Sequence, residues 1–182
     1  MLIGTTRRVL RYHQHMASQP SFDITSKVDL QEVDNAINQA KKELAQRFDF
    51  KGSKSTIELK AKENLIELVA DDNFKMEAVW EIVQTRLHRR GVPIKNLKPG
   101  EIEQIGGSLV KRKVELQQGV SSDAARDIVK FVKDQKLKKV QVTIQGDQLR
   151  VTSGSKDELQ NAIRVLRAED FGLELQFGNF RE

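Results

Sequence analysis

The chain alternates between two kinds of hydrophobic spacing, and the same succession of spacings occurs twice. Apolar residues two positions apart predict strands, whereas apolar residues three or four positions apart predict helices. Between residues 22 and 97 this spacing predicts the order strand, helix, strand, strand, helix, strand. The same order returns between residues 109 and 180. We therefore predict an internal duplication, with the copies offset by roughly 80 to 90 residues.

Local signals support the predicted boundaries of several elements. Asp29 precedes the first helix and Ser155 the last, and each is followed three residues later by a glutamate, which is the spacing of a capping box. The pair Gly146-Asp147 separates two alternating apolar runs, which is typical of a tight hairpin. Two split β-α-β units per copy predict an α+β protein with two ferredoxin-like (βαββαβ) domains. Each would be an antiparallel four-stranded sheet with two helices on one face.

The repeat also predicts the domain boundaries. We expect ferredoxin-like domains at residues 21–100 and 109–182, joined by a linker at residues 101–108. Residues 1–20 lie outside the repeat and form a basic arm with three arginines and no acidic residue. We expect Met16 to be the true start of the protein; a disordered basic arm and a targeting segment are the two alternatives.

Composition excludes several classes of chemistry. The chain has 182 residues, no cysteine and three histidines. It therefore has no disulfide framework and no thiolate nucleophile, and we expect no metal site and no cofactor. It also lacks the phosphate-binding motif Gly-x-x-x-x-Gly-Lys-Ser/Thr. No apolar run approaches the roughly 18 residues of a membrane span, so we expect a cytoplasmic protein that does not bind a membrane. Because the catalytic signatures named above are missing, we also expect that it is not an enzyme.

Positive charge is concentrated around the predicted linker. Residues 86–113 contain eight basic and two acidic residues, a net charge of +6, compared with +5 for the whole chain. A basic region at the join between two domains attracts nucleotides, cyclic dinucleotides or RNA. The alternative is an ordinary solvated linker.

The predicted strand order is also that of an RNA-recognition module, which stacks bases on aromatic side chains of its central strands. The corresponding strands here, near residues 65–69 and 148–151, contain no aromatic residue. Any RNA binding should therefore depend on phosphate contacts and show little sequence preference.

Four motifs in a fixed order resemble the YajQ family. They are Ser21-Phe22-Asp23-Ile24, Arg47-Phe48-Asp49-Phe50-Lys51-Gly52, Gln145-Gly146-Asp147-Gln148-Leu149-Arg150-Val151 and Leu175-Gln176-Phe177-Gly178-Asn179-Phe180-Arg181. The resemblance covers residues 20–182 and leaves out the basic arm. It implies two ferredoxin-like domains and binding of nucleotides, in some members cyclic di-GMP or RNA, without an established catalytic activity.

From charge and resemblance together we expect a non-enzymatic nucleotide-binding protein. One version of this hypothesis is a sensor of cyclic di-GMP or of another nucleotide. The candidate phosphate contacts lie near the join and at the C-terminus: Arg89, Arg90, Lys111, Arg112, Lys113 and Arg181. Alternation along a strand places Lys111 and Lys113 on one face and Arg112 on the other, so we favour the two lysines. Two alternatives stay open, namely an RNA-binding accessory factor and a protein-interaction module for a regulatory partner.

Overall fold

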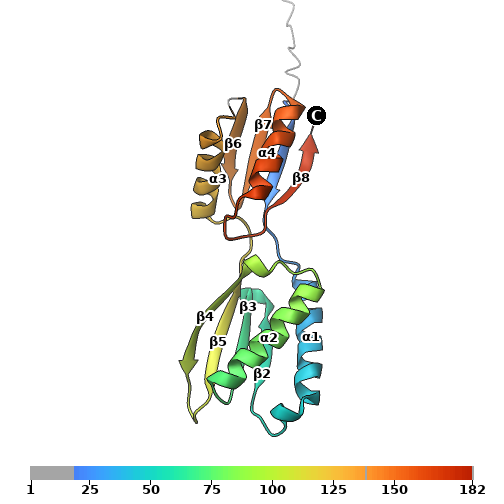
Figure 1. The fold of residues 1–182 in the computed structure, drawn as a ribbon, viewed down its shortest axis with the longest axis vertical. Helices are drawn as coiled ribbons and strands as arrows, with labels where there is room; N and C mark the ends of the chain where they lie inside the picture. Colours follow the sequence, from blue (N-terminus) through green and yellow to red (C-terminus); the bar gives the residue numbers. More distant parts are fainter. Residues whose placement is uncertain (1–18, 138, 182) are drawn as a thin grey trace, which may run out of the picture.

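The fold comprises two lobes, each built from a four-stranded antiparallel sheet and two helices (Figure 1). It is seen in a computed structural model that describes residues 19–137 and 139–181. The predicted basic arm and the start at Met16 therefore lie outside the described residues. Within those ranges, no helix is both long enough and apolar enough to span a bilayer.

The α1/α2 lobe contains the strands β2 (Thr56–Lys60), β3 (Leu65–Ala70), β4 (Leu97–Gln104) and β5 (Val110–Leu116), in the order β2-β3-β5-β4. Its helices are α1 (Leu30–Gln46) and α2 (Asn73–Arg89), with short 3₁₀ turns η1 (Phe48–Phe50), η2 (Ala61–Glu63) and η3 (Ile94–Asn96). The α3/α4 lobe contains β1 (Ser21–Thr25), β6 (Val140–Gln145), β7 (Gln148–Ser153) and β8 (Gln176–Arg181), in the order β6-β7-β1-β8. Its helices are α3 (Ser122–Asp134) and α4 (Lys156–Ala168). The predicted fold class is confirmed.

The predicted helix caps are only partly correct. Asp29 caps α1, since its side chain accepts hydrogen bonds from the backbone N–H groups of Gln31 and Glu32. Ser155 occupies the N-cap of α4 but makes no capping hydrogen bond through its side chain. The capping box predicted at α4 is therefore wrong.

The strand pairing corrects the predicted domain boundaries, because the first strands of the two copies are exchanged. β1 pairs with β7 and β8 of the second copy, and β5 pairs with β3 and β4 of the first. The division into 21–100 and 109–182 therefore does not coincide with the two sheets. Residues 101–104 belong to β4, so the predicted linker is the end of a strand and a turn within one sheet.

The exchange makes the chain cross between the lobes twice, after β1 and after β5. The two crossing segments are hydrogen-bonded to each other: Gly119 N donates to Ser26 O, and the Gln118 side chain bonds both N and O of Val28. Gly119 has a φ of +74°, and a Cβ there would lie 2.7 Å from Cβ of Asp147. Only glycine fits this close approach to the turn between β6 and β7 without a shift of the neighbouring chain.

Asn96 joins both crossings to the α3/α4 lobe from a fully buried position. Its Nδ2 donates to Ser26 Oγ at 2.8 Å and to Gln117 O at 3.0 Å. Its Oδ1 accepts from Glu174 N at 2.9 Å. One side chain therefore satisfies polar groups on three segments where the lobes meet.

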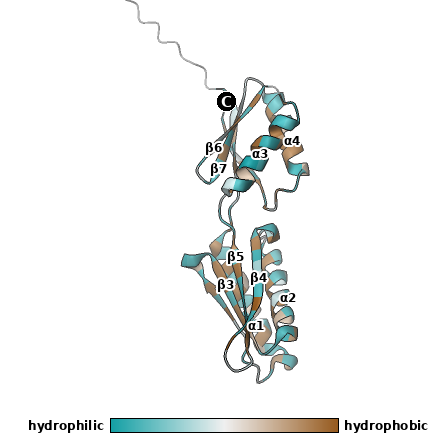
Figure 2. Ribbon diagram, turned by 90° about the vertical axis from the view of Figure 1, so that its left-hand side faces the viewer, coloured by the Kyte–Doolittle hydropathy of each residue, from teal (hydrophilic) through white to brown (hydrophobic). Residues whose placement is uncertain are grey.

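In both lobes the helices cover one face of the sheet and the other face is open to solvent. Figure 2 shows the strands of both lobes on the left and the helices on the right. The two open sheet faces therefore lie on the same side of the molecule. Each lobe has its own apolar core between sheet and helices.

Candidate functional site

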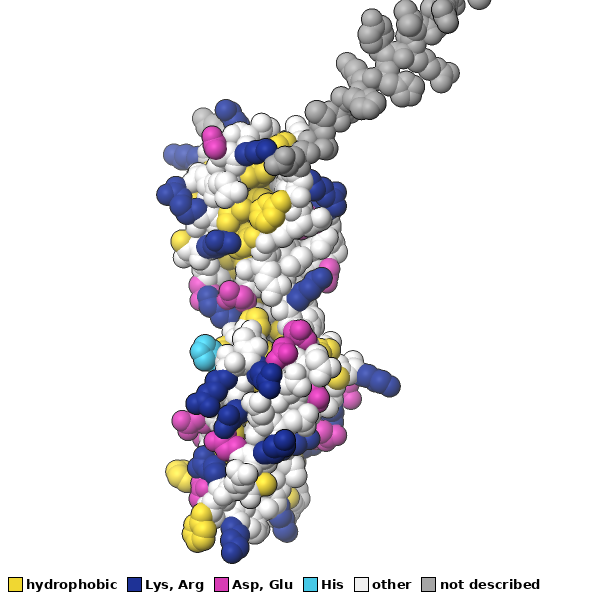
Figure 3. Space-filling model, turned by 90° about the vertical axis from the view of Figure 1, so that its right-hand side faces the viewer, with side chains coloured by type: hydrophobic (Ala, Val, Ile, Leu, Met, Phe, Trp, Pro, Cys, Tyr) yellow, Lys and Arg dark blue, Asp and Glu magenta, His cyan; other side chains and the backbone are white. Residues whose placement is uncertain are grey.

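The six basic residues singled out from the sequence do not form one site. Arg89 and Arg90 lie at the end of α2, in the helix layer, where Nη1 of Arg90 is 3.4 Å from Oε2 of Glu32. On the face drawn in Figure 3, basic side chains are spread over both lobes and interspersed with acidic ones. Where the lobes meet, Lys95 Nζ lies 3.2 Å from Oδ1 of Asp170 and Lys98 Nζ donates to Gly172 O, so two cations of the basic segment contact the α3/α4 lobe.

The three basic residues of β5 divide as the strand alternation predicts. Arg112 faces the helix layer, with Nη2 at 3.0 Å from Oε1 of Glu77 on α2. Lys111 lies on the open face, with Nζ at 3.6 Å from Oε2 of Glu67 on β3. Lys113 also lies on that face, beside a separate hollow. Two of the three cations are thus already paired with carboxylates of their own lobe.

Arg181 lies in the other lobe, at a polar hollow on the open face of the β6-β7-β1-β8 sheet. The hollow has a volume of about 360 Å³. Its lining comprises Asp23, Thr25, Lys27, Gln148, Arg150, Gly178, Asn179 and Arg181. Three of the four sequence motifs contribute to it, from positions more than 100 residues apart. The strand exchange brings them together, because β1 lies between β7 and β8.

Asp23 is the centre of this hollow and is almost fully buried, with 4% of its surface exposed. Arg150 holds it through two contacts, Nε to Oδ1 at 2.8 Å and Nη2 to Oδ2 at 3.0 Å. Asn179 donates from Nδ2 to the same Oδ2. A two-pronged guanidinium contact fixes both side chains in one geometry. The hollow therefore has a rigid polar floor.

The backbone at Asn179 is adapted to this contact. Its φ is +52°, in the left-handed region that asparagine tolerates better than most residues. The pairing of β1 with β8 shifts register between Ser21 and Asp23. Such an irregularity re-aims a side chain, and here the Asn179 amide reaches the carboxylate of Asp23.

The electrostatics of the floor follow from these contacts. The hydrogen bonds from Arg150 hold the pKa of the Asp23 carboxyl below its ordinary value, against the opposing effect of burial, and Asn179 adds to the lowering. Asp23 also raises the pKa of the Arg150 guanidinium. The floor is therefore an ionised pair at neutral pH.

The rim of the hollow carries two cations outside this pair. Among the described residues, neither the Lys27 ammonium nor the Arg181 guanidinium has a hydrogen-bonding or salt-bridge partner. Thr25 and Gln148 add neutral donors and acceptors. The arrangement suits a polar, negatively charged ligand.

The ion pair at Asp23 predicts a pH dependence of stability. A carboxyl whose folded-state pKa is lowered stabilises the fold fully above its unfolded pKa of about 3.9, and this contribution is lost as pH falls through the folded value. We therefore expect the free energy of unfolding to fall more steeply below about pH 5 in the unaltered protein than in Asp23→Asn. Urea unfolding at a series of pH values measures this difference. If the free energy of unfolding fell in parallel with pH in the two proteins, the pKa of Asp23 would be the same in the folded and the unfolded state.

Sequence reasoning did not single out Asp23, Lys27 or Arg150 as site residues. Asp23 and Arg150 lie inside the motifs described above, so the signal was present, but nothing in the spacing shows that β1 joins the second sheet. Within the described ranges, no group of three or more His, Asp or Glu side chains is arranged to hold a metal ion.

Known proteins resemble this chain over the range that contains all four motifs. The family model described as nucleotide-binding protein YajQ-like matches residues 20–181. A "Nucleotide-binding protein" of Trichlorobacter lovleyi is 48% identical over 163 residues, covering 90% of this chain and 99% of the relative. Proteins of the same name from Solibacter usitatus and Citrifermentans bemidjiense are each 52% identical, over 161 and 162 residues. These matches cover 88% and 89% of this chain and 96% and 99% of the relatives.

Proposed function

Because this chain belongs to the family of YajQ-like nucleotide-binding proteins, we propose that it binds a nucleotide on the open face of the β6-β7-β1-β8 sheet. The observation that carries the proposal is the convergence of three family-like motifs around the Asp23–Arg150 pair. The hollow's volume of about 360 Å³ lies within the range of roughly 300 to 1,000 Å³ typical of small-molecule sites.

The two rim cations supply the phosphate contacts in this proposal. Arg181 is paired with Ser21 at one end of β1, whereas Lys27 follows the other end of that strand. Their backbones therefore lie toward opposite ends of β1, which spans roughly 13 Å at about 3.4 Å per residue. Two separated cations suit a ligand with two phosphate groups, and a cyclic dinucleotide such as cyclic di-GMP has this arrangement.

The remaining polar groups recognise the base and ribose. Amide and hydroxyl side chains such as Gln148 and Thr25 supply donors and acceptors on a face without aromatic rings. Asp23 positions Arg150 and does not contact phosphate, because a buried carboxylate repels it. The function is binding and sensing, with no catalytic step.

The test compares two double variants in isothermal titration calorimetry with cyclic di-GMP, GTP and ATP. Loss of two charged contacts in Lys27→Ala plus Arg181→Ala should weaken binding of the preferred nucleotide by about 10- to 100-fold. Lys111→Ala plus Lys113→Ala removes the same charge from the other lobe and should leave affinity unchanged. The reverse result would assign the site to β5, as the sequence suggested. No binding by any nucleotide would favour the protein-interaction alternative.

RNA binding is the second candidate, and the common orientation of the two open faces favours it (Figure 2). A further hollow of about 490 Å³ lies on the open face of the α1/α2 lobe and includes Lys113 and Gln117. A single strand could then contact both lobes through its phosphates. In that case affinity falls steeply with added salt, and both double variants weaken binding.

A further inference from the structure

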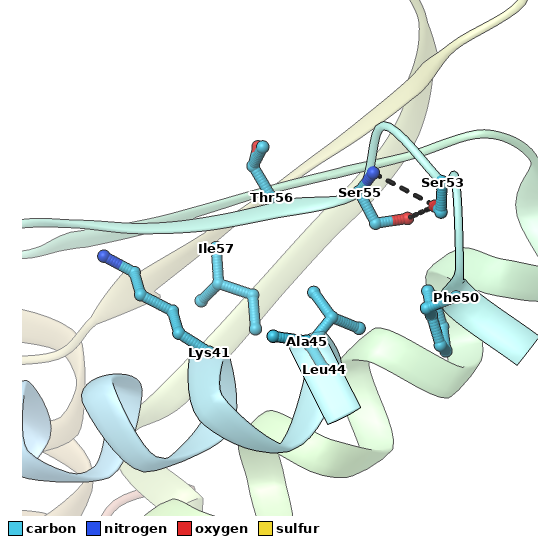
Figure 4. Close-up of a pocket in the computed structure, with 8 residues that line it drawn as sticks. All are labelled: Lys41, Leu44, Ala45, Phe50, Ser53, Ser55, Thr56 and Ile57. Carbon is cyan, nitrogen blue, oxygen red and sulfur yellow. Dashed lines mark hydrogen bonds between the residues drawn. The ribbon is translucent and has the colours of Figure 1, made fainter. Parts of the chain in front are cut away.

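The α1/α2 lobe contains a second, quite different hollow, between α1 and the strand β2 (Figure 4). Its volume is about 330 Å³. It is lined by Lys41, Leu44, Ala45, Phe50, Ser53, Ser55, Thr56 and Ile57. Leu44, Phe50 and Ile57 are buried apolar residues that form its inner surface. An aliphatic side chain fits such a space, whereas a nucleotide phosphate does not.

The strand beside this hollow is an unpaired sheet edge. β2 is the outermost strand in the order β2-β3-β5-β4, so half of its backbone N–H and C=O groups face away from β3. The opposite edge, β4, is interrupted by Pro99 and by a register shift between Pro99 and Ile102. Such features keep an edge from pairing with another chain. β2 has neither, and its pairing with β3 is regular from Thr56 to Lys60.

The hollow and the free edge of β2 beside it together form a groove. Asp71 holds one end of this groove in a fixed shape. Its Oδ2 accepts from Ser53 Oγ at 2.6 Å and from Lys75 Nζ at 2.7 Å, and its Oδ1 accepts from Lys54 N at 3.0 Å. These contacts, the one from Lys75 foremost, hold the pKa of Asp71 well below its ordinary value. A pre-organised wall reduces the ordering cost of binding.

Three lysines lie at or beside the hollow: Lys41 lines it, and Lys42 and Lys54 each adjoin a lining residue in the sequence. Lys41, Lys42 and Lys54 are exposed, and within the described residues their ammonium groups have no salt-bridge partner. The neighbouring carboxylate of Glu43 is held by Arg86 at 2.8 Å. Against Glu58, the exposed carboxylate on β2 itself, the three lysines leave a net positive charge that complements an acidic partner.

We propose that this groove binds an extended, acidic peptide segment of a partner protein. The segment adds to β2 as a fifth strand and places one aliphatic side chain in the hollow formed by Leu44, Phe50 and Ile57. Backbone hydrogen bonds to an edge strand supply affinity, and the pocket for an alternate side chain supplies specificity. This site is separate from the proposed nucleotide site, which lies in the other lobe.

Fluorescence anisotropy with a panel of labelled acidic octapeptides tests the proposal. The panel places leucine, isoleucine or valine at the central position, and alanine there serves as the reference. We expect the best aliphatic peptide to bind at least about 10-fold more tightly than the alanine peptide. Two further peptides carry methyl groups on alternate backbone nitrogens, one on the odd-numbered and one on the even-numbered residues. Only one edge of the peptide pairs with β2, so one of these peptides should lose binding and the other should keep it.

Two matched variants locate the binding. Ala45→Glu places a carboxylate at the groove, whereas Gln46→Glu adds the same charge on the next exposed residue, outside the lining. Ala45→Glu should lower the affinity for the best peptide by at least about 10-fold, and Gln46→Glu should lower it by less than about 2-fold. Circular dichroism confirms that both variants fold.

Several results would overturn the proposal. One is the absence of binding by any panel member below about 1 mM. Another is equal loss of affinity in both variants, or equal tolerance of both methylation registers. A dimer in sedimentation that Ala45→Glu converts to a monomer would assign β2 to a second copy of this chain instead.

Discussion

Replacing Phe22 with alanine should destabilise the α3/α4 lobe by about 3 to 5 kcal/mol, although Phe22 precedes α1 in the sequence. Its side chain is fully buried in the core of that lobe. The ring centroid lies 5.9 Å from that of Phe177 and 6.0 Å from that of Phe180. Truncation removes these contacts and leaves a cavity beneath the sheet.

Hydrogen exchange read by mass spectrometry distinguishes the lobes. In Phe22→Ala, exchange should rise in residues 140–153 and 176–181, which form the same sheet as β1, and remain slow in residues 56–70. The matched variant Phe50→Ala truncates a buried ring of the other core and should give the opposite pattern. It should also change the fluorescence of Trp80, the only tryptophan, which lies in that core. Faster exchange at 56–70 in Phe22→Ala would contradict the strand exchange.

Replacing Asn96 with leucine should cost about 3 kcal/mol of folding free energy. Leucine has a similar shape, but it leaves Glu174 N, Gln117 O and Ser26 Oγ without their partner. An unsatisfied buried polar group costs about 1 to 3 kcal/mol. The effect should extend to both lobes, because these partners lie on the crossings and on the segment before β8.

Thermal unfolding measures this effect. A loss of about 3 kcal/mol corresponds to a fall in Tm of roughly 6 to 12 °C for a protein of this size. Ser26→Ala removes one of the three partners and should cost about 1 kcal/mol. If Asn96→Leu were no more destabilising than Ser26→Ala, the amide would not be the common anchor of the crossings.

Local pattern predicted the elements well because it depends on near neighbours. The helix at Leu30–Gln46 follows from apolar spacing and the Asp29 cap, and the hairpin of β6 and β7 follows from alternation around Gly146-Asp147. The capping box predicted at α4 was wrong, because the spacing is present but the Ser155 side chain makes no hydrogen bond to the first turn of the helix.

The strand exchange could not be read from that pattern, since either first strand has the alternation needed for either sheet. The charges of the cross-strand pairs agree with the exchange. In the strand register Asp23 lies opposite Arg150, and Lys113 lies opposite Glu67 at the corresponding position of the other sheet. Without exchange, Asp23 would lie opposite Glu67, and Lys113 opposite Arg150. Like charges directly opposite each other destabilise a strand pair.

The same exchange explains why the candidate site was only partly foreseen. Arg181 was named from the closing motif, and it lines the hollow at Asp23. Counting charge along the chain drew attention to residues 86–113 instead. Those residues are adjacent in sequence, but strand alternation places Lys111 and Arg112 on opposite faces of one sheet, and Lys95 and Lys98 contact the other lobe.

The sequence by itself determined the elements, the duplication, the fold class and the family, because spacing and motif order are properties of neighbouring residues. Only the tertiary structure decided which sheet each first strand joins, and with it the meeting of Asp23, Arg150 and Arg181. That choice depends on contacts between residues more than 100 positions apart, such as the 2.8 Å contact between Asp23 and Arg150. Hydrophobic spacing alone does not indicate which distant partner a strand will find.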